Sequence, residues 1–210
     1  VRLDRYSVGY FCSISPKFRI YSMIYGALWS WIVQRKRLIA LSAIIYLLHN
    51  LGMKPNTKNH TAVLQHLRLT LPAECLITDG AGLRPYETDG LTAIREMPWV
   101  VVLPETEAQV VDVMAICREH GVPVIPRGAG TGLSGGARPH KDGVVLGLSK
   151  MNKILSIDPE NRVAQVQPGV RNLAISNAAK PHGLYYAPDP SSQIACSIGG
   201  NVAENAGGVH

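Results

Sequence analysis

The chain has 210 residues, which is enough for one or two domains with a hydrophobic core. Its formal net charge of +6 is unevenly placed: residues 1–60 hold nine of the 21 Lys and Arg residues but only one of the 15 acidic residues, so the remainder holds 12 bases and 14 acids. Because the basic excess belongs to the N-terminal segment alone, it does not indicate a nucleic-acid-binding domain, and no nucleic-acid partner is expected.

The N-terminal segment differs from the rest of the chain, and we place a domain boundary between residues 60 and 61. Nine of the 13 aromatic residues precede residue 50. Two uncharged runs, residues 20–33 and 38–53, flank the basic sequence Gln34-Arg35-Lys36-Arg37. Each run falls short of the roughly 18 to 20 apolar residues that a single spanning helix needs. The late first run and the lack of a small-residue cleavage site do not favour a signal peptide.

Two alternatives stay open for this segment. Residues 1–60 are either a helical extension unrelated to the following domain, or a membrane-associated element in which residues 20–53 contact a membrane surface through the basic cluster. We expect a cytoplasmic protein, held peripherally at the inner membrane in the second case. The four cysteines (Cys12, Cys75, Cys117 and Cys196) form no C-x-x-C pair and no set with metal-ligand spacing. This pattern fits a reducing compartment and predicts no metal site.

Residues 61–210 are expected to form the folded domain, which begins with a helix over residues 61–71. That helix ends at Pro72, and the glycines and prolines of residues 77–89 indicate an irregular segment. The continuous apolar run at residues 100–103 predicts a strand that is buried on both faces.

A second helix is predicted to follow this strand. Residues 106–109 (Thr-Glu-Ala-Gln) have the capping-box pattern that begins helices, and Gly121 ends it. The apolar face comprises Val110, Val113, Met114 and Cys117 at helical spacing, so Cys117 is expected in the core. Residues 122–125 then predict a second buried strand.

A glycine-rich stretch, residues 126–137 (Pro-Arg-Gly-Ala-Gly-Thr-Gly-Leu-Ser-Gly-Gly-Ala), follows this strand. Glycine permits positive φ and has no Cβ, so consecutive backbone N–H groups can line a concavity that binds anions. Arg127 is expected to supply positive charge at the rim, and Thr131 and Ser134 to supply hydroxyl donors. The stretch therefore predicts a phosphate cradle rather than a flexible surface loop.

The cradle is not a Rossmann dinucleotide fingerprint, although residues 130–135 match G-x-G-x-x-G. A Rossmann loop opens a helix, whereas residues 138–143 lead into the apolar run 144–148, which predicts another strand. No Gly-Lys-Ser/Thr follows, which excludes a P-loop as well. We therefore expect a strand-to-strand glycine loop that binds a pyrophosphate through backbone amides.

The remaining residues predict a hairpin, a helix and a second glycine-rich loop. Residues 154–157 and 162–167 flank a turn sequence, Asp-Pro-Glu-Asn. A helix over residues 170–180 stops at Pro181, and residues 199–210 are again rich in glycine and asparagine. The order strand, helix, strand, loop, strand indicates an α+β fold with its ligand at the sheet edge. Two glycine-rich loops suit a long ligand with a diphosphate at one end and a polar ring at the other.

Three stretches resemble the FAD-linked subunits of glycolate oxidase and the FAD-linked D-lactate dehydrogenases, in the vanillyl-alcohol-oxidase flavoprotein superfamily. They are residues 126–137, residues 166–173 (Val-Gln-Pro-Gly-Val-Arg-Asn-Leu) and residues 188–201 (Pro-Asp-Pro-Ser-Ser-Gln-Ile-Ala-Cys-Ser-Ile-Gly-Gly-Asn). The resemblance runs from about Thr78 to His210 and does not include residues 1–60. It implies an FAD-binding PCMH-type domain, with the first subdomain and the start of the second. Because family members are much longer, we expect this chain to be an N-terminal fragment.

The resemblance also implies which residues contact the cofactor. Residues 127–132 would hold the FAD pyrophosphate, and later segments would contact the ribityl chain and the isoalloxazine ring. The implied cradle residues are Arg127, Gly128, Ala129, Gly130, Thr131, Gly132, Leu133 and Ser134. The implied later residues are Pro188, Asp189, Pro190, Ser191, Ser192, Ile198, Gly199, Gly200, Asn201 and Asn205. The branch that the chain resembles binds FAD non-covalently, so no covalent link through Cys196 is expected.

The resemblance implies that the whole protein oxidises a 2-hydroxy acid, glycolate or D-lactate, to the 2-oxo acid by hydride transfer to FAD. The implied partners are this small-molecule substrate, a second FAD-binding subunit and an iron–sulfur subunit. No catalytic residue is assigned, because His140, His182 and His210 are expected in a turn, at a helix end and at the terminus. We therefore expect the fragment alone to be inactive.

Two other functions are alternatives to this one. The first is a non-catalytic FAD-binding or electron-transfer subunit of the same type of complex. The second is an NAD enzyme that uses residues 130–135, against which the lack of a following helix argues.

Overall fold

The computed structural model describes residue 1, residues 4–5 and residues 57–209. These residues belong to one unit, formed by residues 1–6 and 57–210. The apolar runs at residues 20–33 and 38–53 lie outside the described residues. The two alternatives for the N-terminal segment, and the boundary between residues 60 and 61, therefore stay predictions.

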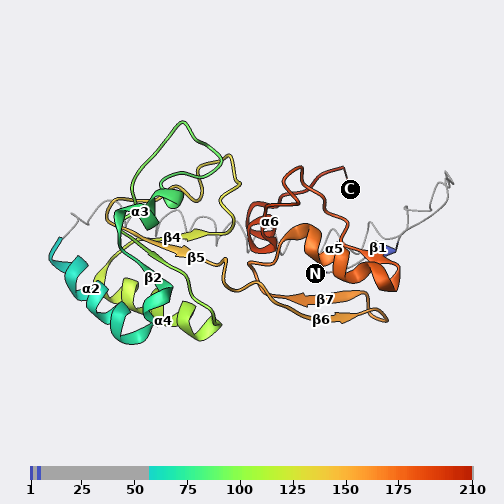
Figure 1. The fold of residues 1–210 in the computed structure, drawn as a ribbon, viewed down its shortest axis with the longest axis horizontal. Helices are drawn as coiled ribbons and strands as arrows, with labels where there is room; N and C mark the ends of the chain where they lie inside the picture. Colours follow the sequence, from blue (N-terminus) through green and yellow to red (C-terminus); the bar gives the residue numbers. More distant parts are fainter. Residues whose placement is uncertain (2–3, 6–56, 210) are drawn as a thin grey trace, which may run out of the picture. The chain divides into compact units, whose positions relative to one another are not determined.

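A four-stranded mixed sheet organises the part of the domain that precedes residue 150 (Figure 1). Its strand order is β2 (Leu76–Ile77), β3 (Val100–Val102), β5 (Val144–Gly147) and β4 (Val124–Arg127). Strands β3, β5 and β4 run parallel, and β2 pairs antiparallel with β3. All residues of β3 and β5 are buried, as their continuous apolar sequences predict for central parallel strands. Strand β4 is only partly buried because it lies at the edge of the sheet.

Helices cover both faces of this sheet because successive strand residues point to opposite sides. On one face, Val100, Val102 and Val144 share a core with α2 (Thr57–Thr70) and α4 (Glu107–His120). On the other face, Val101 and Val145 pack against two short elements, α3 (Gly80–Leu83) and the 3-10 helix η2 (Arg84–Tyr86). The expectation that residues 77–89 are irregular is therefore wrong, since two short helices form within this segment.

Helix α4 has the capping box that its sequence predicts. The Thr106 hydroxyl accepts a hydrogen bond from the Gln109 amide, and the Gln109 side chain accepts one from the Thr106 amide. Gly121 ends the helix in the left-handed conformation. Cys117 is fully buried, and burial raises the pKa of its thiol to about 11, so this thiol stays protonated and unreactive at neutral pH. Met114, predicted on the buried face, is instead 48% exposed, because the buried stripe of α4 is limited to Val113 and Cys117.

A second core lies beyond residue 150. The antiparallel hairpin of β6 (Ile154–Asp158) and β7 (Val163–Val166) packs with α5 (Asn172–Ala179) and with Leu184 of β8 (Leu184–Tyr185). The hairpin and the helix lie where they were expected, but helical structure does not stop at Pro181, because the 3-10 helix η3 (Lys180–His182) contains this residue and extends α5 to Gly183. The start of the chain joins this core: β1 (Asp4–Arg5) pairs with β8, and the Val1 amino group donates to the Ala164 carbonyl at 2.7 Å.

Helix α6 (Ile198–Glu204) occupies the first half of residues 199–210, where we expected a second glycine-rich loop, and residues 206–209 are irregular as expected. It begins after Ser197 and ends at Asn205, which adopts the left-handed conformation with a φ of 52°. The expectation of a loop was based on the many glycines and asparagines of residues 199–210. A Cβ on Gly199 would come within 2.8 Å of the Pro168 Cβ, so the small residue is required for close packing rather than for a turn.

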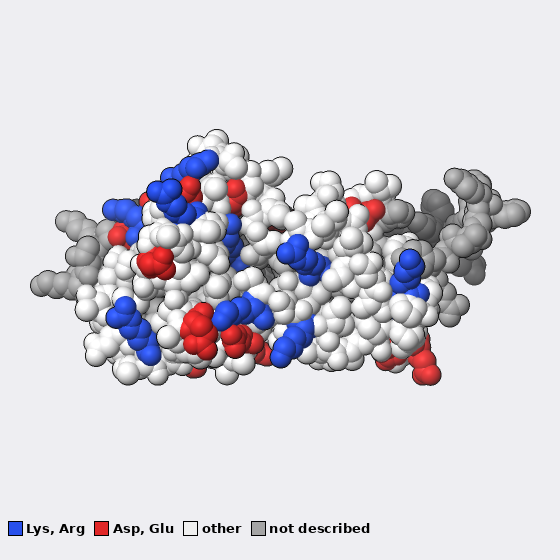
Figure 2. Space-filling model, in the orientation of Figure 1, with Lys and Arg blue, Asp and Glu red and all other residues white. Residues whose placement is uncertain are grey.

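Charged side chains of both signs are interspersed on the face of the molecule shown in Figure 2. This agrees with the nearly balanced charge of residues 61–210. Among the described residues, no helix is both long enough and apolar enough to cross a membrane.

Candidate functional site

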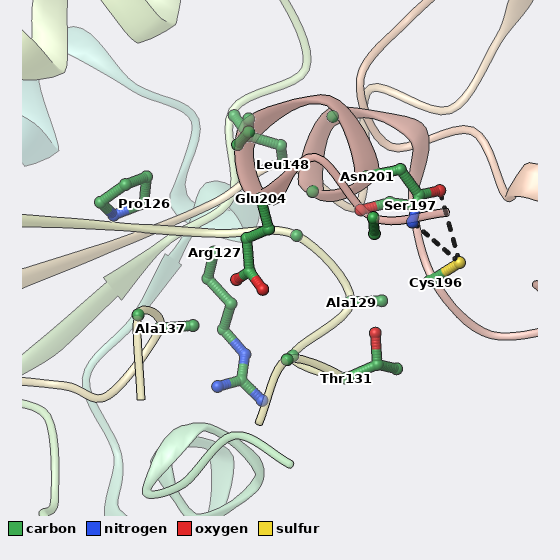
Figure 3. A pocket seen from close by; sticks show the side chains of 18 of the residues that line it. Pro126, Arg127, Ala129, Thr131, Ala137, Leu148, Cys196, Ser197, Asn201 and Glu204 are labelled. Carbon is green, nitrogen blue, oxygen red and sulfur yellow. Dashed lines mark hydrogen bonds between the residues drawn. The ribbon is translucent and has the colours of Figure 1, made fainter. Parts of the chain in front are cut away.

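A cavity of about 660 Å³ lies where the glycine-rich loop after β4 faces α6 and the residues just before it (Figure 3). This volume falls in the range of small-molecule and cofactor sites. The loop is flanked by β4 and β5, so it runs from strand to strand as predicted. It is not followed by the helix that a Rossmann loop requires.

The cavity brings together two of the predicted segments. From the predicted set, its lining contains Arg127, Gly128, Ala129, Gly130, Thr131, Gly132, Leu133, Ser192, Gly199, Gly200 and Asn201. Seven predicted residues are not among those that line it: Ser134, Pro188, Asp189, Pro190, Ser191, Ile198 and Asn205. The Ile198 side chain is buried in the second core instead, and Ser134 is exposed on the loop. Contacts of these seven residues with a cofactor stay predictions.

The glycines of the loop permit close approach between the loop and α6. A Cβ on Gly128 would collide with the Ser197 hydroxyl oxygen, and a Cβ on Gly132 would come within 2.8 Å of a Glu204 carboxylate oxygen. On the opposite side of the loop, a Cβ on Gly90 would come within 2.8 Å of the Thr131 carbonyl oxygen. Glycine is therefore needed at these positions to let the loop lie against its neighbours. Because glycine has no side chain, a ligand can also approach the loop backbone closely.

The Ser197 hydroxyl belongs to the lining of the cavity, and no group in the described part of the protein forms a hydrogen bond with it. The residue is 5% exposed and lines the cavity, and its buried hydroxyl oxygen has no hydrogen-bond partner among the described residues. A buried polar atom without a hydrogen-bond partner in the protein is uncommon, and an ordered water or a ligand oxygen can satisfy it. Together with the glycine-rich loop, this hydroxyl fits a cofactor that carries phosphate or sugar oxygens.

Arg127 does not lie at the rim, which corrects the sequence prediction. Its side chain is 8% exposed and donates to the Thr88 carbonyl at 2.8 Å and to the Pro85 carbonyl at 3.3 Å. The guanidinium carbon lies 5.4 Å from the centre of the Tyr86 ring. Burial lowers the pKa of Arg127, and nearby Tyr86 and Asp89 act in the opposite direction. The side chain thus fastens the start of the loop to residues 85–88.

An amide network supports the other wall of the cavity. The Asn172 amide nitrogen donates to the Pro188 carbonyl at 2.9 Å and to the Asn201 side-chain oxygen at 3.2 Å. The Asn201 amide in turn contacts the Cys196 sulfur at 3.3 Å. Asn172 is 1% exposed, so one buried side chain links α5, α6 and the segment before α6. Cys196 also lines the cavity. The expectation that it forms no covalent link to the flavin stays a prediction.

Several lining residues were missed by the sequence prediction. They are Pro126, Gly136, Ala137, Leu148, Pro168, Cys196, Ser197, Ala203, Glu204 and Ala206. Helical spacing offered a signal for two of them, Ser197 and Glu204, because they lie at i and i+7 with the predicted Gly200 and Asn201 at i+3 and i+4. The expectation of a loop over residues 199–210 did not place these residues on one helix face.

The histidines that were assigned no catalytic role lie away from the cavity wherever the structure describes them. The exposed His140 accepts a hydrogen bond from the Asp142 amide, and His182 is exposed in η3. His210 lies outside the described residues. In the described part of the chain, no group of three or more His, Cys, Asp or Glu residues could hold a metal ion.

Comparisons with known proteins agree with this geometry. The family model described as an FAD binding domain matches residues 98–210. Glycolate oxidase subunit GlcD of Escherichia coli K12 is 58% identical over 152 residues, which cover 72% of this chain and 30% of that protein. A D-lactate dehydrogenase of Anaerostipes hadrus is 46% identical over 112 residues, covering 53% and 23% of the two chains.

A solved structure supports the fold. The crystal structure of p-cresol methylhydroxylase with substrate bound superimposes with a TM-score of 0.64 at 26% identity, covering 72% of this chain and 30% of that one. The present chain thus spans about 30% of the length of the GlcD protein it matches. The family match covers residues 98–210 and includes both walls of the cavity. The chain therefore belongs to the FAD binding domain family of the FAD-linked oxidoreductases.

Proposed function

We propose that this domain holds FAD for the oxidation of a small 2-hydroxy acid, glycolate or D-lactate, to the corresponding 2-oxo acid. The observation that carries the proposal is the shared cavity, in which a strand-to-strand glycine loop faces the buried, unpartnered Ser197 hydroxyl. The substrate class is supported by the names of relatives, which include a glycolate oxidase subunit, a D-lactate dehydrogenase and a D-2-hydroxyglutarate dehydrogenase.

The residues of this chain would bind and orient the cofactor. The loop amides at residues 127–132 would donate to the diphosphate, and the Ser197 hydroxyl would donate to a phosphate or ribityl oxygen. Arg127 would keep the loop in place from behind through its bonds to residues 85–88. When bound, FAD would supply the two-electron acceptor for the hydride of the substrate.

A second candidate is a non-catalytic FAD-binding or electron-transfer subunit of the same kind of complex. It is favoured by one observation: no histidine lines the cavity among the residues described, so no imidazole is placed there to accept the hydroxyl proton. In either case we propose a second FAD-binding subunit and an iron–sulfur subunit as partners. We also propose a cytoplasmic location, with contact at the inner membrane if residues 20–53 bind it.

Loading the purified 210-residue chain with FAD tests the FAD site that both functions share. We expect a flavin absorbance band that co-elutes with the protein after gel filtration, and no comparable retention of NAD. Dye reduction should then be measured with glycolate and with each lactate enantiomer. Stereoselective turnover above a heat-treated control would establish the oxidase function in this chain, whereas bound flavin without turnover is the result expected of the fragment alone and agrees with both functions. A chain that retains no FAD would contradict both.

A further inference from the structure

A carboxylate of the protein itself lies against the predicted diphosphate cradle. Glu204, the last residue of α6, lines the cavity, and one of its carboxylate oxygens lies 2.8 Å from the position that a Gly132 Cβ would take. The same oxygen lies 3.6 Å from the corresponding position on Gly136. Figure 3 shows the side chain pointing from α6 toward the glycine loop.

Nothing in the described part of the protein neutralises this carboxylate. No hydrogen bond or ion pair there includes Glu204, and Arg127, which also lines the cavity, donates to the carbonyls of Pro85 and Thr88 instead. A negative charge at the C-terminal end of a helix is also unfavourable, because the exposed carbonyls there carry partial negative charge. The position of Glu204 therefore does not stabilise α6.

The Glu204 carboxylate instead lies where the glycine loop favours a negatively charged group. Backbone N–H groups of a glycine-rich loop favour an anion, and in this conformation the Glu204 carboxylate is the anion closest to Gly132. The Glu204 residue is exposed, so its side chain is free to turn away without movement of α6.

We propose that Glu204 is an intramolecular competitor for the diphosphate position, because its carboxylate lies beside Gly132 at the wall of the cradle and must turn away, or stay close to the diphosphate, when FAD binds. This proposal rests on the proposed function, since it takes the cradle to be the FAD diphosphate site. Glu204 then lowers FAD affinity, because its carboxylate must either turn away or stay close to the negatively charged diphosphate. Glu204 also favours ligands that make enough additional contacts with the protein to displace its carboxylate.

The size of the effect follows from the charge alone. Two charges of the same sign a few ångströms apart repel even in water and repel more strongly near a protein surface, so removing the Glu204 charge should tighten FAD binding by about tenfold, which corresponds to about 1.4 kcal/mol. Glu204→Gln removes the charge and keeps the size and hydrogen-bonding reach of the side chain. Glu160→Gln, in the exposed turn between β6 and β7, removes the same charge away from the cavity and serves as the matched control.

The experiment is a set of titrations of the full 210-residue chain with FAD, inorganic pyrophosphate and riboflavin, followed by flavin fluorescence or calorimetry at low and high salt. We expect Glu204→Gln to bind FAD and pyrophosphate about tenfold more tightly than the wild type, with the difference shrinking at high salt. Riboflavin, which has no phosphate, should bind both proteins equally. The Glu160→Gln control should behave as the wild type with all three ligands.

Equal or weaker FAD binding by Glu204→Gln would overturn the proposal and leave the proposed function standing. Weaker binding would indicate that the carboxylate accepts a hydrogen bond from the cofactor instead. A gain that is as large for riboflavin as for FAD would also overturn it, because the effect would not depend on the diphosphate. If neither protein binds FAD, the proposed function fails, and this inference fails with it.

Discussion

Replacing Gly130 with valine is expected to abolish FAD binding and to destabilise the domain by about 2 to 4 kcal/mol. Gly130 has a φ of 73°, a conformation that β-branched residues rarely adopt. A Cβ at this position would also collide with the Arg127 guanidinium, which donates to the carbonyls of Thr88 and Pro85. The variant would therefore strain the loop and displace the side chain that fastens it.

The measurements are urea unfolding and FAD titration of the same preparation. Gly183 provides a matched control, because its φ of 67° is similar and a Cβ there would meet nothing within 4 Å. Gly183→Val should show the backbone strain but keep FAD binding, since it does not line the cavity. A folded Gly130→Val protein with wild-type FAD affinity would contradict the assignment of the cradle.

Replacing Asn172 with leucine is expected to destabilise the protein by about 2 to 3 kcal/mol and to weaken FAD binding without altering the glycine loop. The leucine side chain has the same branching and the same number of heavy atoms but cannot donate to the Pro188 carbonyl or to the Asn201 side chain. Both acceptors are buried or partly buried, so the Pro188 carbonyl would lose this donor and the Asn201 oxygen would keep only the weak donor of the Cys196 thiol, at the cost of desolvation.

Thermal or urea unfolding with a parallel FAD titration checks this prediction. Asn177→Leu is the control, because Asn177 is exposed on the same helix and its replacement should change stability by no more than about 0.5 kcal/mol. Equal effects of the two substitutions would show that the buried amide network does not support the cavity wall.

Local sequence patterns predicted the elements whose structure depends on neighbouring residues. The apolar runs of β3 and β5 and the capping box at Thr106 carry their own signals, and each is found where it was expected. The glycine loop was also identified correctly as a strand-to-strand connection, because the residues after it form a strand rather than a helix.

Features that depend on distant residues could not be predicted in the same way. The direction of Arg127 is set by carbonyl groups at Pro85 and Thr88, 42 and 39 positions earlier in the chain. Helix α6 forms despite two glycines, which have low helix propensity, because Gly199 packs against Pro168. The unpartnered Ser197 hydroxyl and the position of Glu204 both depend on α6, so they became visible only in the folded structure.

Hydrogen–deuterium exchange of the 210-residue chain with and without FAD tests most directly the claim that the glycine loop and α6 together bind the cofactor. The account predicts slower exchange on FAD addition in two separate peptides, one covering residues 127–133 and one covering residues 196–201. The hairpin of β6 and β7, which does not line the cavity, should exchange at an unchanged rate. FAD binding that protects other segments and leaves both of these peptides unchanged would contradict the account.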